Sequence, residues 1–210
     1  MVAACRKRGD RVIELGRDTS PRLDLLDEAT MQRSAAAIEG LGRPITRLVV
    51  ATGVLTLGEA GPERALRELD ATRTARLFAV NAIGPALVLK HLWPLLPRDR
   101  ESRVAFLSAR VGSIGDNRLG GWHAYRASKA ALNQLVRTIS VELARTRPRC
   151  ACVLLHPGTV DTNLSRGFSK AGLQVQSPEA AACRLMDVLD GLTPSDTGRF
   201  LDQHGLDVPW

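Results

Sequence analysis

The sequence predicts a single α/β domain built around a doubly wound, mostly parallel β-sheet. Short apolar runs alternate along the chain with longer stretches of helical periodicity, which is the pattern of consecutive strand–helix–strand units. The clearest runs are apolar at nearly every position, as strands are when helices cover both faces of a parallel sheet. No repeat, low-complexity segment or linker interrupts the 210 residues, so one domain is expected to span residues 1–210.

Five apolar runs are expected to form the strands. They lie at 11–15 (RVIEL), 46–52 (TRLVVAT), 103–108 (RVAFLS), 150–156 (CACVLLH) and 198–202 (GRFLD). Helices are expected between them, at 27–41, 63–96, 124–146 and 178–191. The second helix should be kinked or broken at Gly84-Pro85, because proline has no amide hydrogen to donate.

The composition narrows the classes of partner. The formal net charge of +7 and the pI near 9.9 fit either a nucleic-acid-binding protein or a surface that binds an anionic cofactor. The arginines are scattered and aromatic residues make up only 4%, so stacking platforms are scarce and we expect no nucleic-acid partner. No apolar stretch approaches the roughly 18 residues of a membrane helix, and no signal peptide is visible. We therefore expect a cytoplasmic protein with no membrane partner.

The cysteines give no metal or disulfide pattern. The spacings of Cys5, Cys150, Cys152 and Cys183 fit neither a zinc site nor a disulfide framework. Cys150 and Cys152 would point to the same face of a strand. We expect buried, reduced thiols and no metal site.

A tyrosine and a lysine stand four residues apart in GGWHAYRASKAALNQL, residues 120–135, at the start of the longest predicted helix. On a helix, Tyr125 and Lys129 share one face. A free tyrosine has a pKa near 10, and a neighbouring ammonium group favours the phenolate and lowers that pKa. The pair could then supply or remove a proton at an alcohol or carbonyl oxygen. A surface contact is the simpler interpretation of the pair alone, but the pair follows a loop at the carboxyl end of a strand, where open α/β sheets bind ligands.

Four segments together resemble the short-chain dehydrogenase/reductase family. YRASKAALN (125–133) is similar to the Tyr-x-x-x-Lys signature of that family, and HPGTVDT (156–162) to its Pro-Gly segment after the sixth strand. LVVATGVL (48–55) resembles its Asn-Asn-Ala-Gly stretch, and VNAIGP (80–85) the segment that carries its catalytic asparagine. The longer strings LSARVGSIGDNRLGGWHAYRASKAALNQL, LHPGTVDTNLSR and VPW resemble the C-factor-type or sniffer-like carbonyl reductase branch. The resemblance runs from about residue 5 to the C-terminus and implies a Rossmann-like fold.

The resemblance assigns catalytic roles. Tyr125 would be the general acid in carbonyl reduction and the base in alcohol oxidation. Lys129 would lower the pKa of the tyrosine and hold the nicotinamide ribose hydroxyls, and Asn81 would hold a water that links the lysine to solvent. The serine that polarises the substrate carbonyl in the family falls on Ala109, so Ser108 is the candidate for this role, and Ser113 or no residue at all are the alternatives.

The resemblance also implies a cofactor, NADP, with NAD as the alternative. Arg17 follows the strand expected at 11–15, where NADP-dependent relatives place an arginine on the 2′-phosphate. Asp18 could pair with it or oppose the phosphate, and a surface arginine in a turn is the simple alternative. Asp24 would accept a hydrogen bond from the adenine amino group, or be a solvated loop carboxylate. The other expected cofactor contacts are Gly53, Tyr125, Lys129, Pro157, Gly158, Thr159, Val160 and Thr162.

The chain lacks the first strand and the glycine-rich turn with which the family opens. MVAACRKRGDRVIELGR resembles the end of the first helix running into the second strand. The missing strand would lie at the centre of the sheet, so its absence would leave the flanking strands with unpaired backbone groups. We expect an N-terminally incomplete domain. Translation that starts upstream, a fragment and a rearranged truncated chain are the three explanations.

The sequence therefore predicts an oxidoreductase that transfers a hydride between a nicotinamide cofactor and a small-molecule carbonyl or alcohol. The alternative is a signalling or binding protein that keeps the fold with little or no catalysis, which the missing turn and Ala109 favour. The resemblance implies a homodimer in which the predicted helices at 84–96 and 124–146 pair across a two-fold axis. The variable segment 163–177 would cover a substrate whose identity the sequence does not give.

Overall fold

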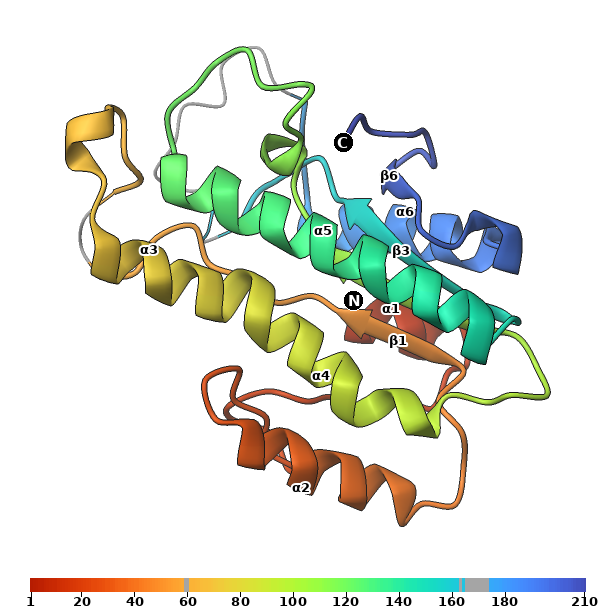
Figure 1. The fold of residues 1–210 in the computed structure, drawn as a ribbon. Helices are drawn as coiled ribbons and strands as arrows, with labels where there is room; N and C mark the ends of the chain where they lie inside the picture. The colour runs from red at the N-terminus through yellow and green to blue at the C-terminus, as the bar shows by residue number, and fades with distance from the viewer. Residues whose placement is uncertain (59–60, 163, 165–173) are drawn as a thin grey trace.

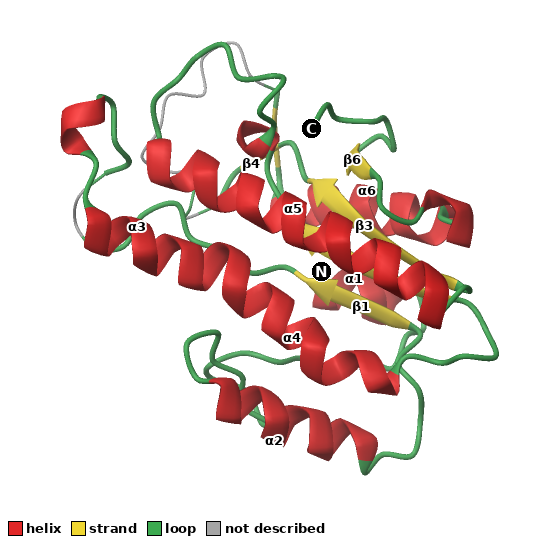
Figure 2. Cartoon of the chain, viewed as in Figure 1, coloured by secondary structure: helices red, strands yellow, loops and turns green. Residues whose placement is uncertain are grey.

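A parallel sheet lies between two layers of helices (Figure 1, Figure 2). The computed structural model describes residues 1–58, 61–162, 164 and 174–210. Within these residues the sheet has four strands, all parallel, in the order β1-β2-β3-β6. They are β1 (Arg47–Val50), β2 (Ser102–Leu107), β3 (Cys150–His156) and β6 (Phe200–Asp202). The predicted single-domain, Rossmann-like α/β fold is confirmed.

The helices occupy both faces of the sheet, with α2, α4 and α5 on one side and α1 and α6 on the other (Figure 1). The described α-helices are α1 (Val2–Lys7), α2 (Glu28–Glu39), α3 (Ala71–Phe78), α4 (Gly84–Leu92), α5 (His123–Thr146) and α6 (Pro178–Gly191). A π-helical turn, Ala79–Ile83, joins α3 to α4. Short 3₁₀ turns lie at Leu66–Glu68, Trp93–Leu95, Arg110–Gly112 and Pro194–Asp196. A separate two-stranded parallel pair consists of β4 (Thr159–Val160) and β5 (Val175–Gln176).

Alternate residues of each strand enter opposite cores, as strand geometry requires. In β3, Cys150, Cys152 and Leu154 pack in the core with α2, α4 and α5, while the residues between them pack against α1 and α6. Burial on both faces explains why CACVLLH is apolar at almost every position. All four cysteines are free thiols, but Cys183 is exposed, so the expectation of buried thiols is wrong for that residue.

Polar side chains fix where three helices begin. Asp27, Asp70 and Ser177 each accept a backbone hydrogen bond in the first turn of α2, α3 and α6, respectively. These caps satisfy amide groups that have no partner inside the helix. The cap at Asp70 also corrects the predicted start of the helix at residue 63, because residues 61–70 form a loop with one 3₁₀ turn.

The strand predicted at 11–15 is wrong. These residues form no strand, and the next pairing along the chain is a single bridge between Gly16 and Arg22. An extended segment becomes a strand only when a neighbour completes its backbone hydrogen bonds. Among the described residues, β1 pairs with β2 alone and is the edge of the sheet. No further strand therefore lies beyond β1 with which residues 11–15 could pair.

The break predicted at Gly84-Pro85 takes the form of the π-helical turn rather than a gap. Pro85 lies in the first turn of α4, directly after the π-helical turn, and has no amide hydrogen to donate to a carbonyl of that turn. Gly84 is required by packing, because a Cβ there would lie 2.7 Å from the Cβ of Leu25. The irregular turn sets Asn81 into the interior.

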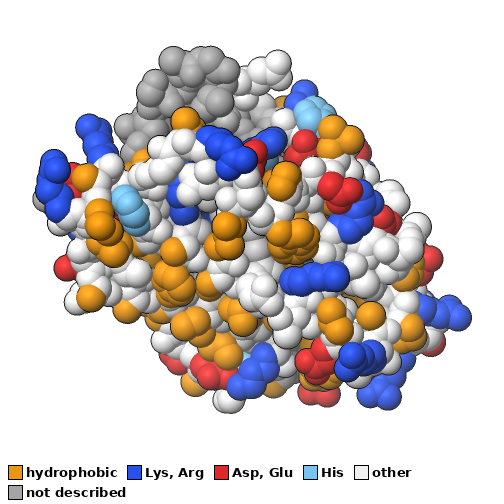
Figure 3. All heavy atoms as spheres, turned by 45° about the horizontal axis from the view of Figure 1, so that its top comes forward, with side chains coloured by type: hydrophobic (Ala, Val, Ile, Leu, Met, Phe, Trp, Pro, Cys, Tyr) orange, Lys and Arg blue, Asp and Glu red, His pale blue; other side chains and the backbone are white. Residues whose placement is uncertain are grey.

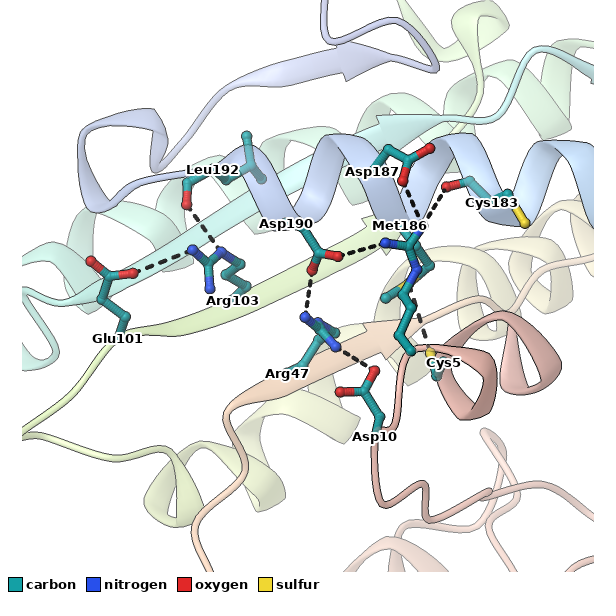
Figure 4. Close-up of polar contacts among 11 residues, drawn as sticks. Cys5, Asp10, Arg47, Glu101, Arg103, Cys183, Met186, Asp187, Asp190 and Leu192 are labelled. Carbon is teal, nitrogen blue, oxygen red and sulfur yellow. Dashed lines mark hydrogen bonds and ion pairs between the residues drawn. The ribbon is translucent and has the colours of Figure 1, made fainter.

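An ion-pair network joins the N-terminal segment to α6 (Figure 4). The guanidinium group of Arg47, at the start of β1, binds the carboxylates of Asp10 and Asp190. Arg8 binds Asp190 as well, at 2.9 Å, and also Asp187. The network lies at the amino ends of the strands, so it holds the sheet together without contributing to a site at their carboxyl ends.

The described residues contain no helix that is long and apolar enough to span a membrane. Nor do they contain a cluster of three or more His, Cys, Asp or Glu side chains able to hold a metal ion.

Candidate active site

The candidate active site lies where the loop after β1 and the end of β2 meet the first turns of α5 (Figure 1). Tyr125 and Lys129 stand one helical turn apart on α5 and are only 6% and 3% exposed. Such burial excludes the surface contact that the sequence left open. A buried ammonium group next to a buried phenol costs free energy unless other groups compensate, which is typical of functional sites.

Lys129 reaches across the site to two loops. Its Nζ donates to the carbonyl oxygen of Leu107, at the end of β2, at 3.0 Å. A Cβ added to Gly53 would lie 3.0 Å from that Nζ and 3.3 Å from Oδ1 of Asn81, so the chain needs glycine here. Burial lowers the pKa of Lys129 to about 8.

The side chain of Asn81 joins the loop after β1 to α5. Its Oδ1 accepts from the amide of Val54 at 2.8 Å, and its Nδ2 donates to the Val54 carbonyl at 2.8 Å and to Oγ of Ser128 at 3.0 Å. Ser128 in turn donates to the carbonyl oxygen of Tyr125 at 2.8 Å. The side chain of Asn81 therefore positions the tyrosine turn of α5, and a water would have to be held by backbone atoms of the π-helical turn, a kind of turn frequent at functional sites.

The pKa of Tyr125 moves opposite to the direction expected from the sequence. Burial raises the pKa of Tyr125 to about 12, because a phenolate loses more hydration than a phenol when both leave water. The ring lies edge-on to Trp122, with 6.3 Å between the ring centroids. The expectation of a lowered pKa is wrong for the free protein, in which burial dominates and the phenol stays protonated at neutral pH.

The hydroxyl group of Ser108 points to α5. Its Oγ donates to Oδ1 of Asn133 at 2.6 Å, and Nδ2 of Asn133 donates to the carbonyl oxygen of Gly112 at 3.3 Å. Ser113, the alternative, accepts from the amide of Asp116 at 3.1 Å and is buried. Both hydroxyl groups thus hold the loop after β2, and Ala109 brings no hydroxyl group to the position where the family has its serine.

The segment from Pro157 to Thr162 follows β3 at the same edge of the sheet. Gly158 has a positive φ of 75°, and a Cβ there would overlap the side chain of Gln203. Nε2 of Gln176 donates to the Pro157 carbonyl at 2.5 Å and to Oε1 of Gln203 at 2.7 Å. Thr159 and Val160 form β4, which is held by β5, so the turn that was predicted to face the cofactor has a fixed backbone.

Arg17 and Asp24 lie outside this group, on the loop that precedes α2. Arg17 is exposed, and no hydrogen bond or ion pair joins it to another described residue. The carboxylate of Asp24 accepts from the amide of Leu26 at 3.0 Å and from Arg22 at 3.4 Å, so it shapes its own loop. Most of the segment 163–177, expected to cover the substrate, lies outside the described residues.

Sequence reasoning missed several polar residues that hold the site. Asn133 could have been found, because it lies one turn beyond Lys129 on the same face of α5. The roles of Glu63, Gln176 and Gln203 could not have been found from local sequence, because each contacts a residue that is distant in the sequence.

The described residues fit the nicotinamide end of NADP better than its diphosphate end. A buried ammonium group lies beside a glycine that leaves the backbone open, and the hydroxyl of neighbouring Thr52 is buried with no hydrogen-bond partner in the described structure. Lys129, Gly53 and the Pro157–Gly158 turn could hold a nicotinamide ribose and its base. Before β1, however, the described residues contain no glycine-rich turn that opens a helix, the usual diphosphate site.

Comparison with known proteins gives a consistent result. The sequence model of a family described as short chain dehydrogenase matches residues 7–172. The C-signal protein of Myxococcus xanthus is 41% identical over 155 residues, which cover 73% of this chain and 88% of that protein. The 1-hydroxy-2-glutathionyl-2-methyl-3-butene dehydrogenase of Rhodococcus sp. (strain AD45) is 31% identical over 210 residues, which cover 100% of this chain and 88% of that enzyme.

A solved structure has the same fold with a cofactor bound. A carbonyl reductase from Pseudomonas aeruginosa PAO1, in complex with NADP, superposes with a TM-score of 0.79 and is 28% identical. The match covers 100% of this chain and 92% of that one. The resemblance identified from sequence motifs is thus confirmed over both sequence and fold.

Proposed function

Since the chain belongs to the short chain dehydrogenase family of NAD(P)-dependent oxidoreductases, we propose that it transfers a hydride between NADP and a small carbonyl or alcohol compound through Tyr125, Lys129 and Asn81. The observation that carries the proposal is the buried Tyr125–Lys129 pair, whose ammonium group lies against Gly53 at the carboxyl end of β1. The NADP complex of the carbonyl reductase from Pseudomonas aeruginosa supports this choice of cofactor.

The two ionisable groups suit proton donation to a carbonyl oxygen. Reduced nicotinamide, when bound, supplies the hydride to the carbonyl carbon. Tyr125 is protonated at neutral pH, because burial raises its pKa to about 12, so it can donate its proton to the oxygen as that hydride arrives. Lys129, whose pKa falls to about 8, is mostly charged at neutral pH and stabilises the phenolate that remains. Solvent then returns the proton to Tyr125, and the alcohol leaves.

The other site residues position these groups. Asn81 fixes the loop after β1 against the tyrosine turn, and Ser108 fixes the loop after β2 through Asn133. We expect the backbone of Pro157, Gly158, Thr159, Val160 and Thr162 to face the nicotinamide and phosphate groups, and Asp24 to face the adenine.

The proposal includes a preference for NADP, which depends on Arg17. Because Arg17 is exposed and has no ion pair among the described residues, its guanidinium group is available to a 2′-phosphate. Replacing Arg17 by alanine is expected to weaken NADPH binding by roughly 1–3 kcal/mol, the scale of a charge-assisted hydrogen bond, and to leave NADH binding nearly unchanged.

The test is a titration of each variant with NADPH and with NADH, followed by nicotinamide fluorescence. The Arg11→Ala variant is the matched control, because Arg11 is exposed and lies six residues earlier in the same segment. Equal losses for both cofactors in Arg17→Ala would show that Arg17 supports the fold rather than the phosphate.

We also propose a homodimer formed through α4 and α5. Ile83, Leu135 and Val141 are exposed apolar residues at 51%, 37% and 43%, and they lie on or next to these two helices. Figure 3 shows hydrophobic side chains over the face in view, with Lys and Arg side chains spread singly rather than gathered in one basic patch. Light scattering at micromolar concentration is expected to give twice the mass of the chain, and the mass of one chain would contradict the proposal.

The cytoplasmic location and the lack of nucleic-acid and membrane partners stay predictions from sequence.

A signalling or binding protein without turnover is the second candidate. Ala109 and the hydrogen bond that occupies Ser108 favour it, since loss of one oxyanion donor costs about 3–4 kcal/mol in other enzymes. NADPH oxidation with a panel of small aldehydes and ketones separates the two functions. Binding of NADPH with no oxidation for any compound would favour the second.

A further inference from the structure

A buried acidic residue fastens a distant loop to the start of the helix that carries Tyr125. Glu63 belongs to the loop before α3 and is only 4% exposed. Its carbonyl oxygen accepts from the amide of Trp122 at 2.5 Å, and Oε2 of its carboxylate accepts from the amide of Ala124 at 3.3 Å. Trp122 and Ala124 lie three residues and one residue before Tyr125, respectively.

The start of α5 needs such a partner. Trp122 occupies the N-cap position with a left-handed φ of 51°, and its side chain does not cap the helix. The first amides of a helix have no partner within the helix. Glu63 supplies one from 61 residues away in sequence.

The helix also compensates the charge of Glu63. No salt bridge joins Glu63 to a Lys, Arg or His among the described residues. A buried carboxylate without a cation is costly, but the partial positive charge of a helix N-terminus stabilises it. The negative charge of Glu63 therefore lies at the N-terminus of α5. Side chains in a helix lean toward the N-terminus, so the side chain of Tyr125 leans toward this charge.

We propose that Glu63 is a positioning residue for Tyr125: its carboxylate fixes the first turn of α5, and its negative charge opposes ionisation of the phenol. The role of Glu63 in proton donation rests on the proposed function, whereas the titration that tests it does not.

The charges on and next to the first turns of α5 act on the phenol in opposite directions. By their sign, the ammonium group of Lys129 and the helix N-terminus favour the phenolate, whereas the carboxylate of Glu63, bound at the amide of Ala124, favours the phenol. Arg126, the next residue, donates to the carbonyl oxygens of Gly120 and Gly121 at 3.2 and 2.9 Å. His123 is the other titratable group in this turn, and its Nδ1 is buried with no partner in the described structure.

The chain offers a direct measurement, because Tyr125 is its only tyrosine. Tyrosinate absorbance after a rapid pH jump reports the ionisation of this one residue, and tryptophan fluorescence in the same record reports unfolding. Glu63→Gln keeps an oxygen that accepts from Ala124 but removes the charge. We expect the ionisation midpoint of Tyr125 to fall by about one pH unit in this variant.

Glu68→Gln is the matched control. Glu68 lies on the same loop, is exposed and accepts from the amide of Arg64. Glu68→Gln therefore removes the same charge from this loop without removing a contact with α5. A midpoint that stays unchanged in Glu63→Gln, or that falls equally in Glu68→Gln, would overturn the proposal. If Glu63→Gln does not fold, Glu63→Asp decides: its shorter side chain draws the charge away from Ala124 and should lower the midpoint by a smaller amount, and no change would overturn the proposal.

The titration requires neither cofactor nor substrate. A shifted midpoint in a protein that never oxidises NADPH would support the link between Glu63 and Tyr125 and count against the proposed function. NADPH oxidation by a protein whose midpoint does not shift would support the proposed function and overturn the link. In an active protein, the alkaline limb of the kcat/KM profile should move with the midpoint, while NADPH affinity should stay unchanged.

Discussion

Replacing Lys129 by methionine is expected to make the free protein more stable near neutral pH and to abolish turnover. The buried ammonium group is held at a cost, because burial lowers its pKa from 10.5 to about 8. A difference of this size corresponds to roughly 3 kcal/mol of unfolding free energy, to order of magnitude. Methionine fills a similar volume without a charge, and such replacements of buried charges often stabilise. The loss of activity follows because nothing would then stabilise the phenolate of Tyr125.

The pH dependence gives the sign of this effect. The pKa of Lys129 is lower in the folded than in the unfolded state, so between pH 8 and pH 10.5 the unfolded chain binds a proton that the folded chain does not. The stability of the wild type relative to Lys129→Met should therefore rise as the pH increases from about 8 to 10.5, and should stay at its low level below pH 8, where both states carry the proton. Urea unfolding of both proteins at several pH values measures the difference.

The exposed residue Lys7 supplies the control for this experiment. Lys7→Met removes a lysine from the surface of α1 and should show no such window. A Lys129→Met variant that is less stable than the wild type near neutral pH would show that Lys129 contributes more through its bond to Leu107 than burial costs.

The sequence predicted the parts of the fold that depend on local pattern. The runs at 46–52, 103–108 and 150–156 became β1, β2 and β3, because a segment that is apolar throughout is stable only when buried on both faces. The long helix at 124–146 followed from its apolar stripe. The strand at 11–15 failed because its stability depends on a neighbour that no local pattern reveals.

In the candidate site, too, the features that depend on local sequence were predicted and those that depend on tertiary contacts were not. The spacing of Tyr125 and Lys129 is local, so helical geometry alone placed them together. The pKa of Tyr125 was predicted in the wrong direction because burial, which raises it, is a property of the tertiary structure. The partner of Ser108 and the contact of Glu63 with α5 also come from distant parts of the chain.

Replacing Tyr125 by phenylalanine is expected to remove turnover and to leave the fold and NADPH binding nearly intact. The ring keeps its packing against Trp122, and only the hydroxyl is lost. General acid–base catalysis by one positioned side chain is worth about 10²–10⁴-fold in rate, so kcat should fall by that factor. Thr138→Val is the control, because it removes an exposed hydroxyl further along α5.

The most direct test of Tyr125 as the proton donor is NADPH oxidation by Tyr125→Phe with a small aldehyde that the wild type reduces, measured together with the dissociation constant of NADPH. We predict a loss of kcat of about 100-fold or more, with that constant changed less than about threefold. Turnover close to that of the wild type, in a variant that still binds NADPH, would show that another group donates the proton.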